Sequence, residues 1–92
     1  MDKIISIHAT VSGKVQGVFY RKNTAIKAKS LGLTGWVKNN VDETVSLVAC
    51  GDPEKINLLI AWLWQGPSMA RVSDVSWHEI VVEDFEGFEV RL

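Results

Sequence analysis

A single cysteine among 92 residues limits the chemistry that this sequence can support. Cys50 cannot form an internal disulfide, and one thiol cannot build a metal site from cysteines alone. The two histidines, His8 and His78, lie in strand-like stretches without the spacing of metal ligands. We therefore expect no bound metal and no cofactor. The lack of disulfides agrees with a reducing compartment, and we expect a cytoplasmic location.

Long apolar runs and a surplus of basic residues are missing as well. No apolar stretch approaches the ~20 residues that cross a bilayer, and residues 1–4 lack the apolar core of a signal peptide. The formal net charge is −1, from 10 basic and 11 acidic residues. A protein that binds nucleic acid or a membrane surface is expected to carry a basic excess. The composition thus argues against a membrane and against nucleic acid as a partner.

The apolar content is that of an ordinary globular protein. Hydrophobic residues make up 47% of the sequence, and the length suits one small domain spanning residues 1–92. A domain of this size buries only about 60–65% of its unfolded surface, so the core must be small. The sequence contains no repeat, no linker and no sustained heptad pattern, and we expect a monomer.

Apolar periodicity predicts five strands and two helices. Residues 4–12 alternate between apolar and polar, as in a half-buried strand. A stretch rich in Lys and Ala then predicts a helix that stops at Gly32, and Asp52 and Pro53 begin a second helix that stops before Gly66. The predicted strands are 4–12, 33–39, 44–50, 71–82 and 88–92, and the predicted helices are 20–31 and 53–65.

The order of these elements is βαββαβ with a short extra strand. The short gap between the second and third strands predicts an antiparallel hairpin, and each βαβ half should cross over right-handedly. This order predicts the ferredoxin-like α+β sandwich, in which two helices cover one face of an antiparallel sheet. Its first and third strands are central. In this layout the loop after the first strand lies beside the end of the second strand only if folding brings Asn39 towards that loop.

The stretch Ser12–Arg21 has the composition of an anion-binding turn. Gly13 and Gly17 allow backbone N–H groups to approach an anion, and a helix N-terminus adds unpaired donors and a favourable dipole. Arg21 supplies a planar fork of donors that fits a phosphate. Taken alone, Arg21 is more often a solvated residue of a first helical turn, and both glycines could be turn residues only. These residues predict an anion site without naming a reaction.

Ser12–Arg21 resembles the acylphosphatase motif G-x-V-Q-G-V-x-[aromatic]-R. A second stretch, Gly32–Asn39, resembles the G-[apolar]-x-G-W-V-x-N motif of that family and ends 18 residues after the arginine of the first. The chain length, the order of elements and the terminal run Phe88–Arg91 also fit, so the resemblance covers essentially the whole chain. One departure is the hairpin turn, where Asp42 and Glu43 stand in place of the glycine often found there.

The resemblance implies a hydrolase that cleaves acyl phosphates to a carboxylate and inorganic phosphate without metal or cofactor. It implies that Arg21 binds the phosphate and that the side-chain amide of Asn39 orients the attacking water. The phosphate would be surrounded by backbone N–H groups of Lys14, Val15, Gln16, Gly17, Val18 and Phe19. The partner is then a small-molecule acyl phosphate, whose acyl part the sequence leaves open.

The chemistry of an acyl phosphate suits these residues. The compound is a mixed anhydride whose leaving group is a carboxylate, so no general acid is required. In enzymatic phosphoryl transfer, most of the rate acceleration comes from positioning the reactants and from fixed hydrogen-bond donors that stabilise charge. Neither Arg21 nor Asn39 is a strong base. The base is therefore the phosphate oxygen of the substrate itself or bulk water.

Two other functions use similar folds or cradles. A ferredoxin-like RNA- or ligand-binding module without catalysis is the main alternative. RNA-binding versions place aromatic residues on central strands and carry positive charge, whereas the first strand here offers Ser6, His8 and Thr10. A cradle that serves a larger carbamoyl-phosphate-handling enzyme is the second alternative. We expect it less, because nothing in the sequence follows Leu92 to use the product.

Overall fold

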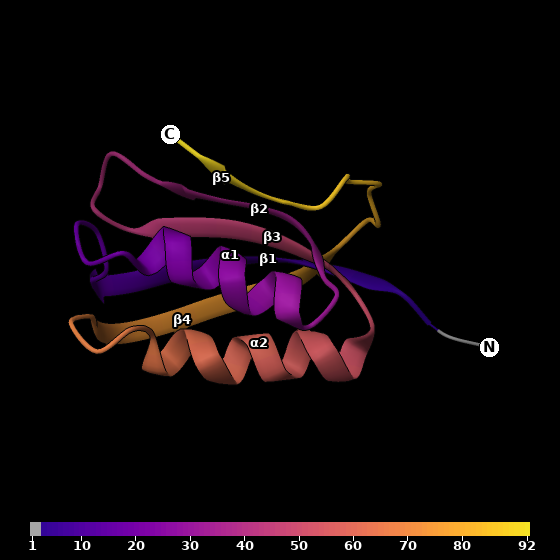
Figure 1. Ribbon diagram of the computed structural model, residues 1–92, viewed down its shortest axis with the longest axis horizontal. Coiled ribbons are helices and arrows are strands. Elements are labelled where there is room, and N and C mark those ends of the chain that lie inside the picture. Colours follow the sequence, from indigo (N-terminus) through magenta and orange to yellow (C-terminus); the bar gives the residue numbers. More distant parts are fainter. Residues whose placement is uncertain (1–2) are drawn as a thin grey trace.

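A computed structural model describes residues 3–92 and contains seven elements in the predicted order (Figure 1). They are β1 (Ile5–Lys14), α1 (Tyr20–Ser30), β2 (Thr34–Asn39), β3 (Val45–Gly51), α2 (Pro53–Gln65), β4 (Arg71–Ile80) and β5 (Phe88–Arg91). Each element begins and ends within two residues of its predicted bounds. The first two residues of the predicted domain lie outside the described ones.

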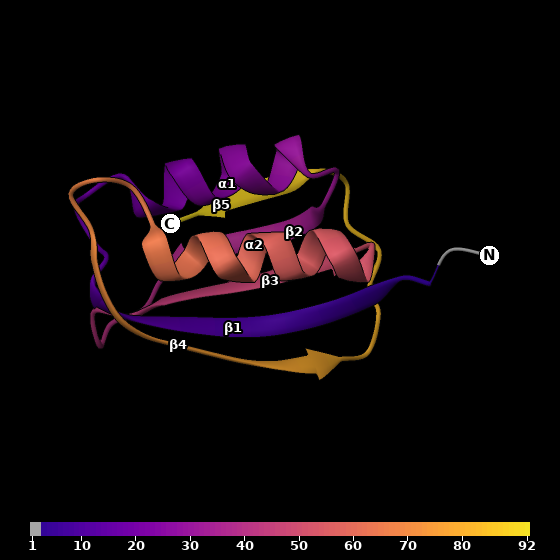
Figure 2. The ribbon, with the colours of Figure 1, turned by 90° about the horizontal axis from the view of Figure 1, so that it is seen from below.

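The five strands form one sheet in the order β4-β1-β3-β2-β5. As predicted, β1 and β3 are central, and the pairings of β4 with β1, β1 with β3 and β3 with β2 are antiparallel. β5 adds a parallel pairing along β2, from Gly35 opposite Phe88 to Lys38 opposite Arg91. The sheet is therefore mixed rather than wholly antiparallel. Both helices cover the same face of it, which gives the ferredoxin-like sandwich (Figure 2).

The core fills the space between the sheet and the helices. The alternating pattern of β1 places Ile7 and Val11 fully buried under the helices. From the other layer, α2 contributes Ile56, Leu59 and Leu63 at helical spacing, and all three are at most 1% exposed. Removing one such side chain, as in Leu59→Ala, typically costs about 2–5 kcal/mol of stability. This packing holds α2 against β3 and β4.

The start of α2 and the end of α1 lie where the sequence predicted them. The Asp52 carboxylate accepts the N–H of Glu54 at 2.8 Å, and Pro53 occupies the first helical position of α2. α1 stops at Gly32, whose φ of 71° lets Gly32 and Leu33 donate their N–H groups back to the last turn. Within the described part of the chain, neither helix is long and apolar enough to cross a membrane.

Strand direction determines where the polar motif residues gather. β1 and β2 are both antiparallel to β3, so they run the same way, and β5 runs parallel to β2. The C-terminal ends of these three strands therefore lie at one end of the sheet, on the left in Figure 1. α1 starts at this end, and β4 begins there with Arg71 opposite Lys14. The topology thus brings the N-terminus of α1, Asn39 and Arg91 to the same end of the molecule.

Candidate active site

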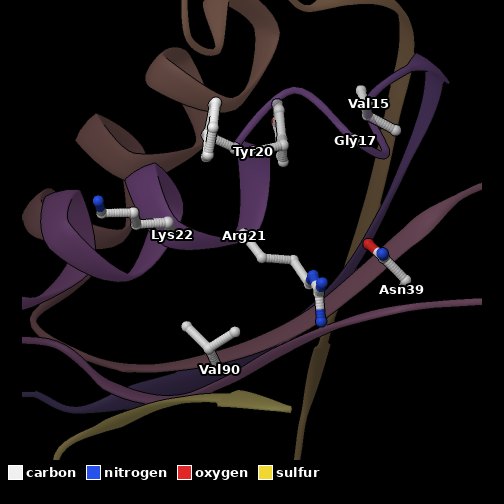
Figure 3. Close-up of a pocket in the computed structure, with 8 residues that line it drawn as sticks. Val15, Gly17, Tyr20, Arg21, Lys22, Asn39 and Val90 are labelled. Carbon is white, nitrogen blue, oxygen red and sulfur yellow. The ribbon is translucent and has the colours of Figure 1, made fainter. Parts of the chain in front are cut away.

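A cavity of about 290 Å³ opens at this end of the sheet (Figure 3). It is enclosed by the loop between β1 and α1, the first turn of α1, the end of β2 and β5. Its lining residues are Val15, Gly17, Phe19, Tyr20, Arg21, Lys22, Asn39 and Val90. Figure 3 shows the Arg21 guanidinium and the Asn39 amide directed towards the same space. The structure therefore brings together the two side chains to which the sequence assigned the phosphate and the water.

The loop between β1 and α1 supplies one wall of the cavity. Of the six loop residues expected to surround a phosphate, Val15, Gly17 and Phe19 line it. The other three line neighbouring depressions of the surface instead, and they are Lys14, Gln16 and Val18. Gly17 has a φ of 74°, a left-handed conformation that glycine adopts at little cost. A side chain at position 17 would be strained and would project from the loop into open space.

Gly13 has a role different from the predicted one. It lies at an irregularity in β1, where the register with β4 shifts between Ser12 and Gly13. A Cβ atom at this position would overlap the carbonyl oxygen of Arg71 on β4. Gly13 therefore allows close approach of two strands, and it does not line the cavity.

Gln16 holds the loop against the turn between β2 and β3. Its side-chain Nε2 donates to the carbonyl oxygen of Asn40 at 2.8 Å and to that of Thr44 at 2.9 Å. Both acceptors belong to the segment that directly follows Asn39. Because one side chain joins the two segments, the position of the loop relative to Asn39 is fixed.

Arg21 is held from the far side by the last strand. Its Nη1 donates to the carbonyl oxygen of Arg91 at 2.8 Å. Arg91 is in turn positioned by Glu89, whose carboxylate lies 2.9 Å from its Nε, and by the ring of Trp36, 4.9 Å from its Cζ. A guanidinium has five N–H donors. One of them is bound to β5, and no further hydrogen bond of the Arg21 guanidinium forms within residues 3–92, which leaves donors for an anion in the cavity.

The Asn39 side chain has an unpartnered acceptor. Its Oδ1 is buried and has no hydrogen-bond partner in residues 3–92, a property that it shares only with Oγ of Ser6 there. A buried polar atom without a partner typically costs about 1–3 kcal/mol, and such atoms call for an explanation in the chemistry of the site. Asn39 also lines the cavity. Because its Oδ1 is buried, a small movement of the side chain must expose this oxygen before a water in the cavity can donate to it.

Tyr20 lines the cavity, but its hydroxyl is used for packing. The hydroxyl donates to the carbonyl oxygen of Leu63 at 2.6 Å, which joins the start of α1 to the end of α2. Burial raises the pKa of the Tyr20 hydroxyl well above its usual value. The hydroxyl therefore stays protonated and does not act as a base.

The electrostatic character of the cavity is cationic. Arg21 and Lys22 line it, and no carboxylate is among its lining residues. A cavity with cations and without acids attracts an anion, even though the whole chain carries a net charge of −1. In the part of the chain that the structure describes, no three His, Cys, Asp or Glu side chains gather as metal ligands do.

Sequence reasoning missed several contributors to the site. Lys22 and Val90 line the cavity, and the Arg91 carbonyl positions Arg21. Lys22 belongs to the basic residues that the sequence clusters in and just after Ser12–Arg21, a cluster that suits a small anion, although no role at the site was assigned to it. The hydrogen bond from Arg21 to the Arg91 carbonyl oxygen could not have been inferred. Every residue has a backbone carbonyl, so the amino-acid type at position 91 does not indicate this contact. Gln16 was assigned a backbone role, whereas its side chain makes the structural contact.

Residues 7–90 of the chain match the family model described as acylphosphatase. The chain belongs to the acylphosphatase family. An acylphosphatase of Coxiella burnetii (strain Dugway 5J108-111) is 60% identical to it over 85 residues, which are 92% of this chain and 90% of the relative. Both motifs of the family therefore lie inside the matched region.

Solved acylphosphatases share the same fold. The structure of an acylphosphatase from Coxiella burnetii superimposes with a TM-score of 0.93 at 57% identity, covering 96% of this chain and 93% of that one. The acylphosphatase from Bacillus subtilis gives the same TM-score at 28% identity, covering 96% and 99%. The resemblance to acylphosphatases, the ferredoxin-like fold and the assignment to acyl-phosphate hydrolases are thus confirmed, and a non-catalytic binding module is not favoured.

Proposed function

We propose that Arg21, Asn39 and the loop before α1 carry out the hydrolysis of acyl phosphates in this chain. The observation that carries the proposal is the unpartnered Oδ1 of Asn39, which lies at the same cationic cavity as Arg21. The cavity offers one group that binds an anion and one that accepts a hydrogen bond from water. Hydrolysis of a phosphoric anhydride requires both.

Arg21 and the loop hold the phosphoryl group. The free N–H groups of the Arg21 guanidinium hydrogen-bond to the phosphate oxygens, and backbone N–H groups of Val15, Gly17 and Phe19 surround them. Lys22 adds positive charge at the rim. Because these donors are fixed before the substrate arrives, they stabilise the charge that develops in the transition state without reorganising. The N-terminus of α1 contributes its dipole in the same direction.

Asn39 supplies the geometry of attack. Its Oδ1 accepts a hydrogen bond from the water and aims a lone pair of the water oxygen at phosphorus. A bond forms from that oxygen to phosphorus, and the bond from phosphorus to the bridging oxygen breaks. The carboxylate leaves with the electron pair, and a proton of the water passes to a phosphate oxygen. The products are a carboxylate and inorganic phosphate, and the step requires no general acid because a carboxylate is a good leaving group.

We also propose that residues 1–92 act as one monomeric domain in the cytoplasm, on a small molecule and not on nucleic acid. The net charge of −1 and the restriction of basic residues at the site to Arg21 and Lys22 support a small anion over a polymer. The single cysteine, Cys50, is buried and cannot form an internal disulfide, which is compatible with a reducing compartment.

Phosphate release from acetyl phosphate in the presence of a chelator tests this function. We expect the wild type to turn over without added metal and Arg21→Gln to lose at least about 10²–10³ in rate, because one preorganised donor contributes that much. Lys27→Gln is the matched control, since Lys27 is a basic residue of the same helix that does not line the cavity. Release that stops on chelation, or survives in Arg21→Gln, would contradict the proposal.

A further inference from the structure

A second depression adjoins the phosphate cavity. It is a groove of about 550 Å³ between α1 and the loop that joins α2 to β4. Its lining residues are Val18, Phe19, Lys22, Asn23, Ile26, Pro67, Ser68 and Met69. Phe19 and Lys22 line the cavity as well as the groove. A molecule whose phosphate lies in the cavity therefore has this groove directly beside it.

The groove gathers apolar side chains that are otherwise unfavourably exposed. Phe19 is 72% exposed, Met69 66% and Ile26 55%, although each is large and hydrophobic. They come from three segments: the loop before α1, the loop after α2, and α1 itself. Exposed apolar side chains that converge on one groove are typical of a binding surface. The lining contains no carboxylate, and its one charged residue is Lys22.

Phe19 adds an independent indication of function. Its φ of 63° is left-handed, an uncommon conformation for a bulky residue, and no side chain caps the helix at this position. Such strain costs of order 1–3 kcal/mol and concentrates at ligand-binding sites. The Asn23 side chain and the Asn23 backbone N–H both donate to the Phe19 carbonyl oxygen, at 2.9 and 3.0 Å. These contacts hold the strained residue in place with its ring exposed.

The opposite wall of the groove is also held in position. The loop between α2 and β4 is closed by a hydrogen bond from the Ala70 N–H to the Pro67 carbonyl at 3.0 Å. At its start, Gly66 packs so closely on the ring of Tyr20 that a Cβ would lie 2.8 Å from it. This loop and the loop before α1 lie at the same end of the molecule in both views (Figures 1 and 2).

We propose that this groove binds the acyl substituent of the substrate and favours apolar, especially aromatic, acyl groups. The inference rests on the proposed function, because it places the phosphate in the adjoining cavity. The acyl carbon is joined to the phosphate through one oxygen, so its substituent must lie within a few ångströms of the phosphate site. Phe19 and Lys22 stand at the junction, and Ile26 and Met69 line the groove beyond it. A ring that packs against these side chains is removed from water.

The test compares benzoyl phosphate with acetyl phosphate on the double variant Ile26→Ser/Met69→Ser. Both residues are exposed and outside the catalytic cavity, so the fold and the hydrolysis of acetyl phosphate should persist. We expect kcat/KM for benzoyl phosphate to fall roughly tenfold while that for acetyl phosphate stays at the wild-type value. The difference in leaving group between the two substrates is the same for both proteins. A change in the ratio of kcat/KM for benzoyl phosphate to kcat/KM for acetyl phosphate, from the wild type to the variant, therefore reports the effect of the groove alone.

Leu58→Ser is the control for general loss of exposed apolar surface, because Leu58 is exposed on α2 and does not line the groove. Leu58→Ser should leave kcat/KM for both substrates at the wild-type value. Unchanged benzoyl phosphate hydrolysis in the double variant, or an equal loss on both substrates, would overturn the acyl-site inference while leaving the proposed function in place. A wild type that hydrolyses neither substrate would overturn both.

Discussion

At the scale of single residues, two non-glycine positions in residues 3–92 adopt left-handed backbone conformations: Phe19 with a φ of 63° and Glu43 with a φ of 74°. Phe19 lies at the site, where strain accompanies an exposed ring. Glu43 lies in the turn between β2 and β3, where the resemblance to the family led us to expect a glycine. A left-handed residue other than glycine costs about 1–2 kcal/mol.

Replacing Glu43 by glycine should therefore stabilise the protein. The gain should be about 0.5–1 kcal/mol, since the relief of strain is partly offset by the greater flexibility of glycine in the unfolded chain. Urea unfolding measures it. Val41→Gly, in the same turn but without a positive φ, should give no gain. If the two variants unfold at the same urea concentration, the left-handed backbone of Glu43 does not destabilise the protein measurably.

His8 makes stability depend on pH. It lies on β1, half-buried, with the ring of His78 on β4 5.6 Å away and Lys38 of β2 nearby. Burial lowers the pKa of His8, and the charges of His78 and Lys38 lower it further. His8 therefore takes up a proton at higher pH in the unfolded chain than in the folded protein. The contribution of neutral His8 to the free energy of unfolding is complete above about pH 6.5, the pKa of an unfolded histidine, and is lost as the pH falls through the lower pKa of the folded state.

The expected result is a larger loss of stability in the wild type than in His8→Gln when the pH is lowered from 7 to 5.5. Thermal unfolding of both proteins at a series of pH values measures this difference. His78→Gln should reduce the pH dependence only in part, because burial of His8 remains. If the unfolding temperatures of the wild type and His8→Gln change with pH in parallel, His8 has the same pKa in the folded and unfolded states, which would contradict this prediction.

At the scale of elements, the loop before α1 and the turn after β2 act as one unit through Gln16. Gln16→Ala removes two hydrogen bonds, at a cost of about 1–3 kcal/mol in total, while the carbonyl oxygens of Asn40 and Thr44 keep the backbone N–H groups of Glu43 and Asn40. It should also lower kcat, because the loop is no longer fixed relative to Asn39. Gln16→Glu should be worse than Gln16→Ala, since a carboxylate of the same shape faces the same two carbonyl oxygens and cannot donate to them.

Urea unfolding and acetyl phosphate turnover of both Gln16 variants test this tether. Lys14→Ala, at the end of β1 where this loop begins, serves as the control, since no side-chain hydrogen bond of Lys14 occurs in the described chain. Full activity in Gln16→Glu would mean that the loop keeps its position without the tether.

The elements themselves followed from the sequence with few errors, because their signals are local. Asp52 and Pro53 fixed the start of α2, and Gly32 fixed the end of α1, all through contacts within one helical turn. The placement of β5 was not predicted. Its parallel pairing with β2 joins segments more than 50 residues apart, and a four-residue strand carries little pattern of its own.

At the scale of the whole molecule, the site is a consequence of strand direction. β1, β2 and β5 all end at one end of the sheet, so the loop, Asn39 and the Arg91 carbonyl converge there. The ferredoxin-like order of elements left the meeting of Arg21 and Asn39 conditional, and the family resemblance paired them; in the structure both line one cavity. The order of elements was not sufficient for the apolar groove, because exposed side chains from separate segments have no shared sequence pattern.

The central claim is the division of roles between Arg21, which holds the phosphate, and Asn39, which directs the water. Measuring the affinity for inorganic phosphate together with kcat on acetyl phosphate separates the two roles. Asn57→Ala, an exposed amide on α2, is the control and should match the wild type in both. We predict that Arg21→Gln loses phosphate binding and turnover together, whereas Asn39→Ala keeps its phosphate affinity and loses about 10²–10³ in kcat. A folded Asn39→Ala protein with near-normal kcat would contradict the account.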